Sequence, residues 1–177
     1  SDFPVCLNKV FINKPPNFLS TVAIVERAGC DKHPIDIKTE EGCLTLLSYT
    51  WADQVERLAL LKSACEVART VPFTIQQSSA AIWLEQKLAE LPTKTTTVVF
   101  HSIIWQYISP EEQEKIRQVI EDASQRASID APLAWLRMEP DDLSRSCPPS
   151  LRLRSFPGCE HLLATSAYHA PAVRWMA

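Results

Sequence analysis

Residues 95–108 read T-T-T-V-V-F-H-S-I-I-W-Q-Y-I, an apolar run that carries a histidine and a serine in its middle. A continuous apolar strand without alternation is typical of a parallel sheet whose two faces are covered by helices. Ser109-Pro110-Glu111-Glu112 then supplies an N-cap, a proline at the first helical position and a capping-box glutamate. This unit indicates an α/β protein. It also places His101 and Ser102 near the carboxyl end of a strand, where open α/β sheets bind their ligands.

Strands and amphipathic helices alternate through most of the remaining sequence. We predict further strands at residues 21–26, 43–49, 71–75 and 131–139. Helices are predicted after Thr50 or Asp53, after Ser78 or Ser79, and over residues 110–127. The pattern changes at residues 151–156, L-R-L-R-S-F, which alternate with a period of two before Pro157-Gly158. Such alternation before a Pro-Gly turn predicts an antiparallel hairpin.

These elements predict a three-layer α/β fold with a mostly parallel sheet and a C-terminal antiparallel hairpin. The first nineteen residues contain Pro4, Pro15 and Pro16 without a sustained period, so residues 1–19 are expected to form an irregular N-terminal arm. Residues 20–177 are long enough to bury one core and are predicted to form a single domain.

Composition argues against several classes of partner. The net charge of −3 comes from 18 basic and 21 acidic residues that are spread along the chain, which argues against nucleic acid and anionic membranes. No apolar stretch approaches the ~20 residues of a membrane span, and the first residues do not resemble a signal peptide. The six cysteines include no C-x-x-C pair, so free thiols are favoured over disulfides or a zinc site. A cytoplasmic location is expected.

Three residues are candidates for catalysis. His101 is a candidate base and Ser102 a candidate substrate-orienting hydroxyl, while Glu139 ends the strand predicted at residues 131–139 and would receive a substrate amine or hydroxyl. The alternative interpretation is a packed imidazole, with a hydroxyl and a carboxylate that cap local backbone. Because neighbouring strand residues point to opposite faces, His101 and Ser102 alone do not form a nucleophile–base pair.

Other side chains are candidates for substrate binding. Trp105 and Tyr107 lie just beyond His101 and would line an aromatic pocket. Arg27, Asp31 and Asp36 share one polar loop. That loop also contains His33, but the spacing of these side chains along the sequence is poor for a metal site. Turn-forming aspartates, or an Arg27–Asp31 ion pair, are the favoured interpretations of the loop. No metal is expected.

Several stretches match one known family. They are R-A-G-C-D-K-H-P-I-D at residues 27–36, Y-T-W-A-D-Q-V-E-R-L at 49–58, V-F-H-S-I-I-W-Q-Y at 99–107, P-L-A-W-L-R-M-E-P at 132–140 and the terminal Y-H-A-P-A-V-R-W. Through them the chain resembles a family of uncharacterised bacterial proteins, classed as a domain of unknown function. The resemblance implies a methyltransferase-like, Rossmann-type doubly wound fold.

One departure from the family bears on cofactors. Family members are longer and carry an upstream strand with a Ser-Ala-Gly-type turn, the counterpart of an S-adenosylmethionine loop. This chain has only Gly29, Gly42 and Gly158, none in a G-x-G arrangement after a strand. The resemblance therefore implies that the chain corresponds to the carboxyl-terminal portion of such a protein. No cofactor is expected in the chain as given, and S-adenosylmethionine would bind only with upstream sequence.

Two functions of different classes follow as hypotheses. One is an enzyme that modifies a small molecule, with a methyltransferase-like fold and its cofactor loop missing from this chain. The other is a non-catalytic interaction or scaffold domain, since one fold hosts many functions. An apolar strand edge near residues 21–26 or 98–104 would recruit another chain, so a homo-oligomer is expected.

Overall fold

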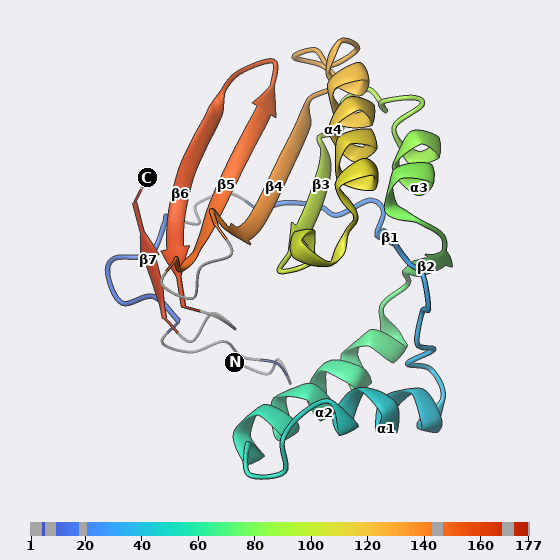
Figure 1. Ribbon diagram of the computed structural model, residues 1–177, viewed down its shortest axis with the longest axis vertical. Coiled ribbons are helices and arrows are strands. Elements are labelled where there is room, and N and C mark those ends of the chain that lie inside the picture. The colour runs from blue at the N-terminus through green and yellow to red at the C-terminus, as the bar shows by residue number, and fades with distance from the viewer. Residues whose placement is uncertain (1–4, 6–9, 18–20, 143–146, 168–171, 177) are drawn as a thin grey trace. The chain divides into compact units, whose positions relative to one another are not determined.

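The computed structural model describes residue 5 and residues 10–17, 21–142, 147–167 and 172–176 (Figure 1). The chain divides into two compact units. The first consists of Ser1–Asn8 and Thr21–Ser79, and the second of Lys9–Ser20 and Ala80–Ala177. The assignment of residues 20–177 to a single domain stays a prediction. Each unit is described by itself below.

The first unit contains a small sheet and a helical pair. Strands β1 (Ala28–Asp31) and β2 (Thr74–Gln77) pair in parallel. Between them in sequence lie helices α1 (Glu40–Ser48) and α2 (Val55–Thr70), which contact each other. The prediction of a helix after Thr50 or Asp53 is confirmed by α2. The strand predicted at residues 71–75 is found slightly later, as β2.

Two predicted strands of the first unit are wrong. Residues 21–26 form no strand, and residues 43–48 belong to α1, with Tyr49 as its C-cap. The helix forms because Thr39 is its N-cap, whose side chain accepts a hydrogen bond from the Gly42 backbone N–H at 3.0 Å, and because Glu40 and Glu41 suit the helix dipole. Gly42 is required there, since a Cβ atom would lie 1.9 Å from the carbonyl oxygen of Asp36.

The second unit is built on a five-stranded sheet in the order β3-β4-β5-β6-β7. Its strands are β3 (Thr97–Ser102), β4 (Leu133–Pro140), β5 (Pro149–Phe156), β6 (Glu160–Ser166) and β7 (Val173–Trp175). Only β3 and β4 pair in parallel, and the other neighbours are antiparallel. The prediction of a mostly parallel sheet is therefore wrong. The connections after β4 and β5 are too short for the crossover that parallel neighbours need.

The hairpin at the end of the chain is confirmed. Strands β5 and β6 pair antiparallel on either side of Pro157-Gly158. Gly158 has a φ of +147°, a backbone conformation that favours glycine, and a Cβ atom there would lie 2.5 Å from Ser155 Oγ.

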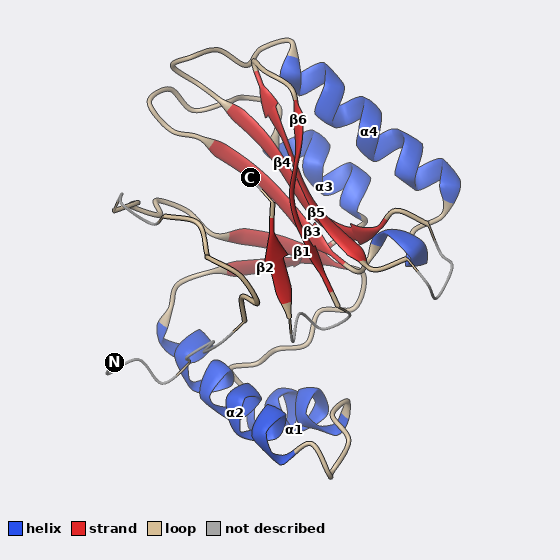
Figure 2. Cartoon of the chain, turned by 90° about the vertical axis from the view of Figure 1, so that its left-hand side faces the viewer, coloured by secondary structure: helices blue, strands red, loops and turns tan. Residues whose placement is uncertain are grey.

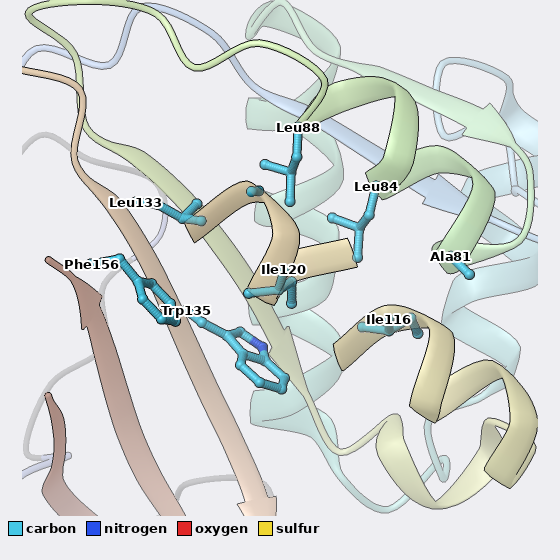
Figure 3. Close-up of a cluster of buried hydrophobic side chains, with 9 residues drawn as sticks. Ala81, Leu84, Leu88, Ile116, Ile120, Leu133, Trp135 and Phe156 are labelled. Atoms are coloured by element: carbon cyan, nitrogen blue, oxygen red, sulfur yellow. The ribbon is translucent and has the colours of Figure 1, made fainter. Parts of the chain in front are cut away.

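Helices α3 (Ala80–Lys87) and α4 (Pro110–Ser124) lie together on one face of this sheet (Figure 2). Their buried side chains pack with the sheet in one apolar core, drawn in Figure 3, that consists of Ala81, Leu84, Leu88, Ile116, Ile120, Ala123, Leu133, Trp135 and Phe156. Among the described residues, this unit therefore has two layers, helix on sheet.

The start of α4 agrees with its predicted cap. Ser109 Oγ accepts a hydrogen bond from the Glu112 backbone N–H at 3.3 Å, with Pro110 at the first helical position. The Glu112 carboxylate also accepts a hydrogen bond from the backbone N–H of Ala80 at 3.1 Å, and this bond joins the start of α4 to the start of α3.

Residues 10–13 of the N-terminal arm lie along β7. The Ile12 N–H donates to the Val173 carbonyl at 2.9 Å, and the Val173 N–H donates to the Val10 carbonyl at 2.7 Å. The Asn13 side chain exchanges two hydrogen bonds with the backbone of Trp175. Among the described helices, none has the length and apolar character that a membrane crossing requires.

Candidate functional site

A cavity of about 270 Å³ lies in the second unit, next to the core. Strand register explains why its lining residues come together: His101 of β3 is opposite Arg137 of β4, which is opposite Arg152 of β5. Side chains two residues apart on a strand share a face, so Trp135 and Glu139 join Arg137 on the helix-covered side. The short 3₁₀ helix η1 (Trp105–Tyr107) and α4 complete the lining.

His101 and Glu139 form a buried pair in this cavity. His101 Nδ1 lies 2.7 Å from Glu139 Oε1, and the side chains are 15% and 10% exposed. The Ile104 backbone N–H donates to the same carboxylate oxygen at 3.2 Å. A carboxylate only accepts hydrogen bonds, so the neutral imidazole carries its proton on Nδ1 and presents an unprotonated Nε2.

Two atoms of this pair lack a partner although they are buried. Among the described residues, neither His101 Nε2 nor Glu139 Oε2 has a hydrogen-bond partner. Buried polar atoms are nearly always hydrogen-bonded, and an exception calls for an explanation such as catalysis or a bound molecule. Both atoms belong to residues that line the cavity, but each has less than 1 Å² of accessible surface.

The backbone beside the pair is strained. Ile103 has a φ of +51°, which is unusual for a β-branched residue. This conformation ends β3 and turns the chain into η1, so that the next residue directs its N–H to Glu139. Strain of this kind costs about 1–3 kcal/mol and clusters at functional sites.

Aromatic rings form the walls around His101. The imidazole stacks on Trp105 with 5.1 Å between ring centroids and 19° between planes. Trp135 lies 6.0 Å from both rings and is only 4% exposed. Arg117 and Arg137 place their guanidinium groups over Trp105 and Trp135, at 5.2 and 4.6 Å from the ring centroids. The imidazole is therefore held on one side by a carboxylate and on others by indole rings.

Ion pairs neutralise the arginines around the cavity. They are Arg117 with Glu114, Arg137 with Glu160, Arg152 with both Asp141 and Glu160, and Arg154 with Glu121. Arg152 donates from both Nε and Nη2 to the Asp141 carboxylate, at 3.0 and 3.1 Å. These hydrogen bonds hold the pKa of Asp141 below its ordinary value and raise the pKa of Arg152. In the described structure Glu139 has no such guanidinium partner.

The structure brings together three of the residues predicted from sequence. His101, Glu139 and Trp105 all line the cavity. Ser102 follows His101 on the same strand, takes the opposite face of the sheet and does not line the cavity. Tyr107 belongs to η1, but it is 73% exposed and also lies outside the lining.

The other predicted substrate-binding residues lie in the first unit. Asp31 accepts a hydrogen bond from the His33 backbone N–H at 2.7 Å, and Asp36 accepts one from the Lys38 N–H at 3.0 Å. These are the turn-forming contacts offered above as the alternative. A role of Arg27, Asp31 and Asp36 in substrate binding stays a prediction. Among the described residues, no group of histidine, cysteine and acidic side chains is arranged to hold a metal ion.

Sequence reasoning missed most of the charged lining. The sequence analysis does not single out Arg117, Trp135, Arg137, Asp141 or Arg152, all of which line the cavity. A usable signal was present, because Trp135, Arg137 and Glu139 are spaced two apart in a predicted strand and must share a face. The alternation over residues 151–156 likewise places Arg152 and Arg154 together.

Comparison with known proteins identifies the family. The model of the DUF2332 family, described as uncharacterised protein conserved in bacteria, matches residues 1–175. The chain belongs to this family. No curated protein and no solved structure matches the chain. The methyltransferase-like fold and the correspondence to a carboxyl-terminal portion stay predictions.

Proposed function

We propose that this family member is an enzyme that modifies a small molecule and that His101 acts as its general base. The observation that carries the proposal is the buried His101–Glu139 pair, which lines a cavity and whose Nδ1–H···Oε1 contact leaves Nε2 without a hydrogen-bond partner among the described residues. His101 is the proposed catalytic residue. Glu139 is a positioning residue that fixes the tautomer and ring orientation and stabilises the imidazolium once a proton has been accepted.

The surroundings suit this role. A cavity of about 270 Å³ accommodates a small metabolite but not a folded partner. The indole walls restrict solvent and hold the imidazole in one orientation, which makes a positioned base more effective. A correctly placed acid or base contributes typically about 10²–10⁴-fold to a reaction rate.

Methyl transfer would be a more specific reaction, and fewer observations support it. Gly29 lies within β1, Gly42 within α1 and Gly158 in the β5–β6 turn. None lies between a strand and the helix that follows it, where backbone N–H groups approach a cofactor most closely. We therefore keep the prediction that the chain as given does not bind S-adenosylmethionine tightly, and we base the proposed chemistry on proton transfer.

The proposal is tested by an activity screen with matched variants. The purified chain is incubated with pooled small metabolites, and mass spectrometry detects those that are consumed. For any reaction found, we expect His101→Gln to lower kcat at least about 100-fold, and Glu139→Gln to lower it less. Ser102→Ala is the control, since Ser102 neighbours His101 on the opposite face, and it should retain activity. Full activity in His101→Gln would contradict the proposal.

The alternative function, an interaction or scaffold domain, is favoured by one observation. Strand β3 ends the described sheet order, and Val98 and Phe100 on it are 54% and 60% exposed. An apolar edge strand is a template for pairing with another chain. We propose on this basis that the protein forms a homo-oligomer. A cytoplasmic location stays a prediction that cell fractionation would test.

A further inference from the structure

The atom on which the proposed function depends is closed off in the structure. His101 Nε2 has less than 1 Å² of accessible surface, although the residue itself lines the cavity. A general base must lie within hydrogen-bond reach of the proton that it takes, directly or through one water. A group that covers the imidazole therefore has to move before this base can act.

The groups packed around the imidazole differ in how freely they can move. Trp135 and Glu139 belong to β4, a strand that is paired on both sides, and they are 4% and 8% exposed. Trp105 instead lies on η1, a 3₁₀ helix of three residues between β3 and α4, and stacks on the imidazole at a centroid distance of 5.1 Å. Among the ring and ion-pair contacts of His101 with described residues, the Trp105 stack is the one that can open without disturbing the sheet.

The segment that carries Trp105 has the properties of a hinged element. Ile103, just before η1, has a φ of +51°, and a swing of η1 away from the sheet lets this residue return to an extended conformation. Ile104 and Tyr107 are 43% and 73% exposed, so opening the segment uncovers little additional apolar surface at these positions. Segments with few buried contacts open locally at a low free-energy cost.

One side chain of α4 holds η1 in its closed position. Gln113 Nε2 donates to the carbonyl oxygens of Trp105 and Ile108, at 2.8 and 3.0 Å, and so spans η1 from one end to the other. Arg117, one turn further along α4, places its guanidinium 5.2 Å from the Trp105 ring centroid. Because α4 is anchored in the core by its buried face, Gln113 is a fixed point against which η1 can open.

We propose, building on the proposed function, that η1 is a lid over His101 and that Gln113 is its latch. In the closed lid, the Trp105 indole covers the imidazole. In the open lid, both Gln113 hydrogen bonds are broken, and Nε2 is exposed to a small substrate in the cavity. The fraction of open molecules then limits the apparent affinity for the substrate, and closure keeps water from the reacting groups.

Diethyl pyrocarbonate tests the lid without a substrate, because it acylates the unprotonated nitrogen of a neutral imidazole. Peptide mass spectrometry near pH 7 follows its reaction with His101 and with His33, an exposed histidine of the first unit that serves as the internal reference. In the native chain we expect His101 to react at least about tenfold more slowly than His33, because only the open fraction reacts. Gln113→Ala should speed the reaction of His101 at least about fivefold, because two hydrogen bonds no longer favour the closed lid.

Two further variants and one measurement serve as controls. Gln118→Ala removes the same side chain from the same helix, where Gln118 donates to Asp122, and it should leave the rate unchanged. Trp105→Ala removes the cover itself and should bring the rate of His101 close to that of His33. The backbone amide of Ile120, a residue of α4 that is 1% exposed, should exchange with solvent as slowly in Gln113→Ala as in the native chain, which reports that the core stays folded.

The outcomes separate the lid from the proposed function. A native His101 that reacts as fast as His33, or a rate that a folded Gln113→Ala leaves unchanged, would overturn the lid. Should one variant fail to fold, the native comparison with His33 and the other variant decide. A freely reactive His101 would remove the lid and leave the general base in place, whereas full activity in His101→Gln would remove the base and leave the measured lid.

Discussion

At the scale of single residues, the site depends on how one carboxylate is shared. Glu139 Oε1 accepts from the His101 imidazole and the Ile104 backbone, which fixes the imidazole, while Oε2 has no hydrogen-bond partner within the described part of the chain. Burying a carboxylate with an open oxygen costs stability. The positive φ of Ile103, which brings the neighbouring N–H to this carboxylate, adds to the cost. Both features are consistent with a site in which function takes precedence over stability.

The Asp141–Arg152 ion pair gives a pH dependence with a definite sign. Hydrogen bonds from Arg152 lower the pKa of Asp141 in the folded state. The pair therefore stabilises the fold above the unfolded-state pKa of about 3.9, and the contribution is lost as the pH falls through the folded pKa. The Asp141 side chain is 49% exposed, so the contribution to the free energy of unfolding should not exceed about 1 kcal/mol.

Urea unfolding of the native chain and Asp141→Asn measures this contribution. We expect the variant to be less stable near neutral pH, and the difference to shrink toward zero as the pH falls through the lowered pKa of Asp141. A difference that grows on acidification would contradict the assignment of the pair.

At the scale of elements, the start of α4 is capped and is joined to the start of α3. Ser109 caps the helix, and Glu112 in its first turn accepts the Ala80 N–H at the start of α3. We expect Ser109→Ala to lower the free energy of unfolding by about 0.5–2 kcal/mol, because one of the N-terminal N–H groups loses its partner. Ser109→Asp keeps an acceptor at the cap and should restore stability. If urea unfolding shows the same loss of unfolding free energy in both variants, the side-chain acceptor at the cap does not stabilise the helix.

Elements whose caps, turns and apolar patterns lie within their own segment were predictable from the sequence. Helix α4 has its cap, its proline and its buried stripe within one segment, and the β5–β6 hairpin has alternation and a Pro-Gly turn. Helix α1 was mistaken for a strand because its apolar run is short, and the deciding contacts, from Thr39 and the close approach of Asp36 to Gly42, lie outside that run. Sheet direction was mistaken because it depends on connection length rather than on strand composition.

The same distinction applies to the site. His101, Glu139 and Trp105 were found because they lie at or just beyond the ends of predicted strands, where α/β proteins place functional groups. Arg152 was missed because its strand joins the site only through antiparallel pairing with β4. The unpartnered atoms of His101 and Glu139 are properties of packing, and no pattern of residue types predicts them.

At the scale of the whole molecule, the exposed edge of β3 predicts self-association. In light scattering over a concentration series, we expect a mass at least twice the 19.9 kDa of one chain. Phe100→Lys adds a charge to the edge strand and should shift the equilibrium toward monomer. Ile82→Lys is the control, because Ile82 is similarly exposed, at 56%, but lies on α3. A native chain that stays monomeric at every concentration would contradict this prediction.

The account as a whole depends on His101, a residue that lines the cavity, having an unprotonated Nε2 that can accept a proton. The most direct measurement is a long-range ¹H–¹⁵N NMR correlation of the imidazoles near pH 9, where histidine is neutral, with His101 assigned from the spectrum of His101→Gln. The account predicts the Nδ1–H tautomer with an unprotonated Nε2, and a weaker preference in Glu139→Ala. A proton on Nε2 in the neutral imidazole would contradict the central claim.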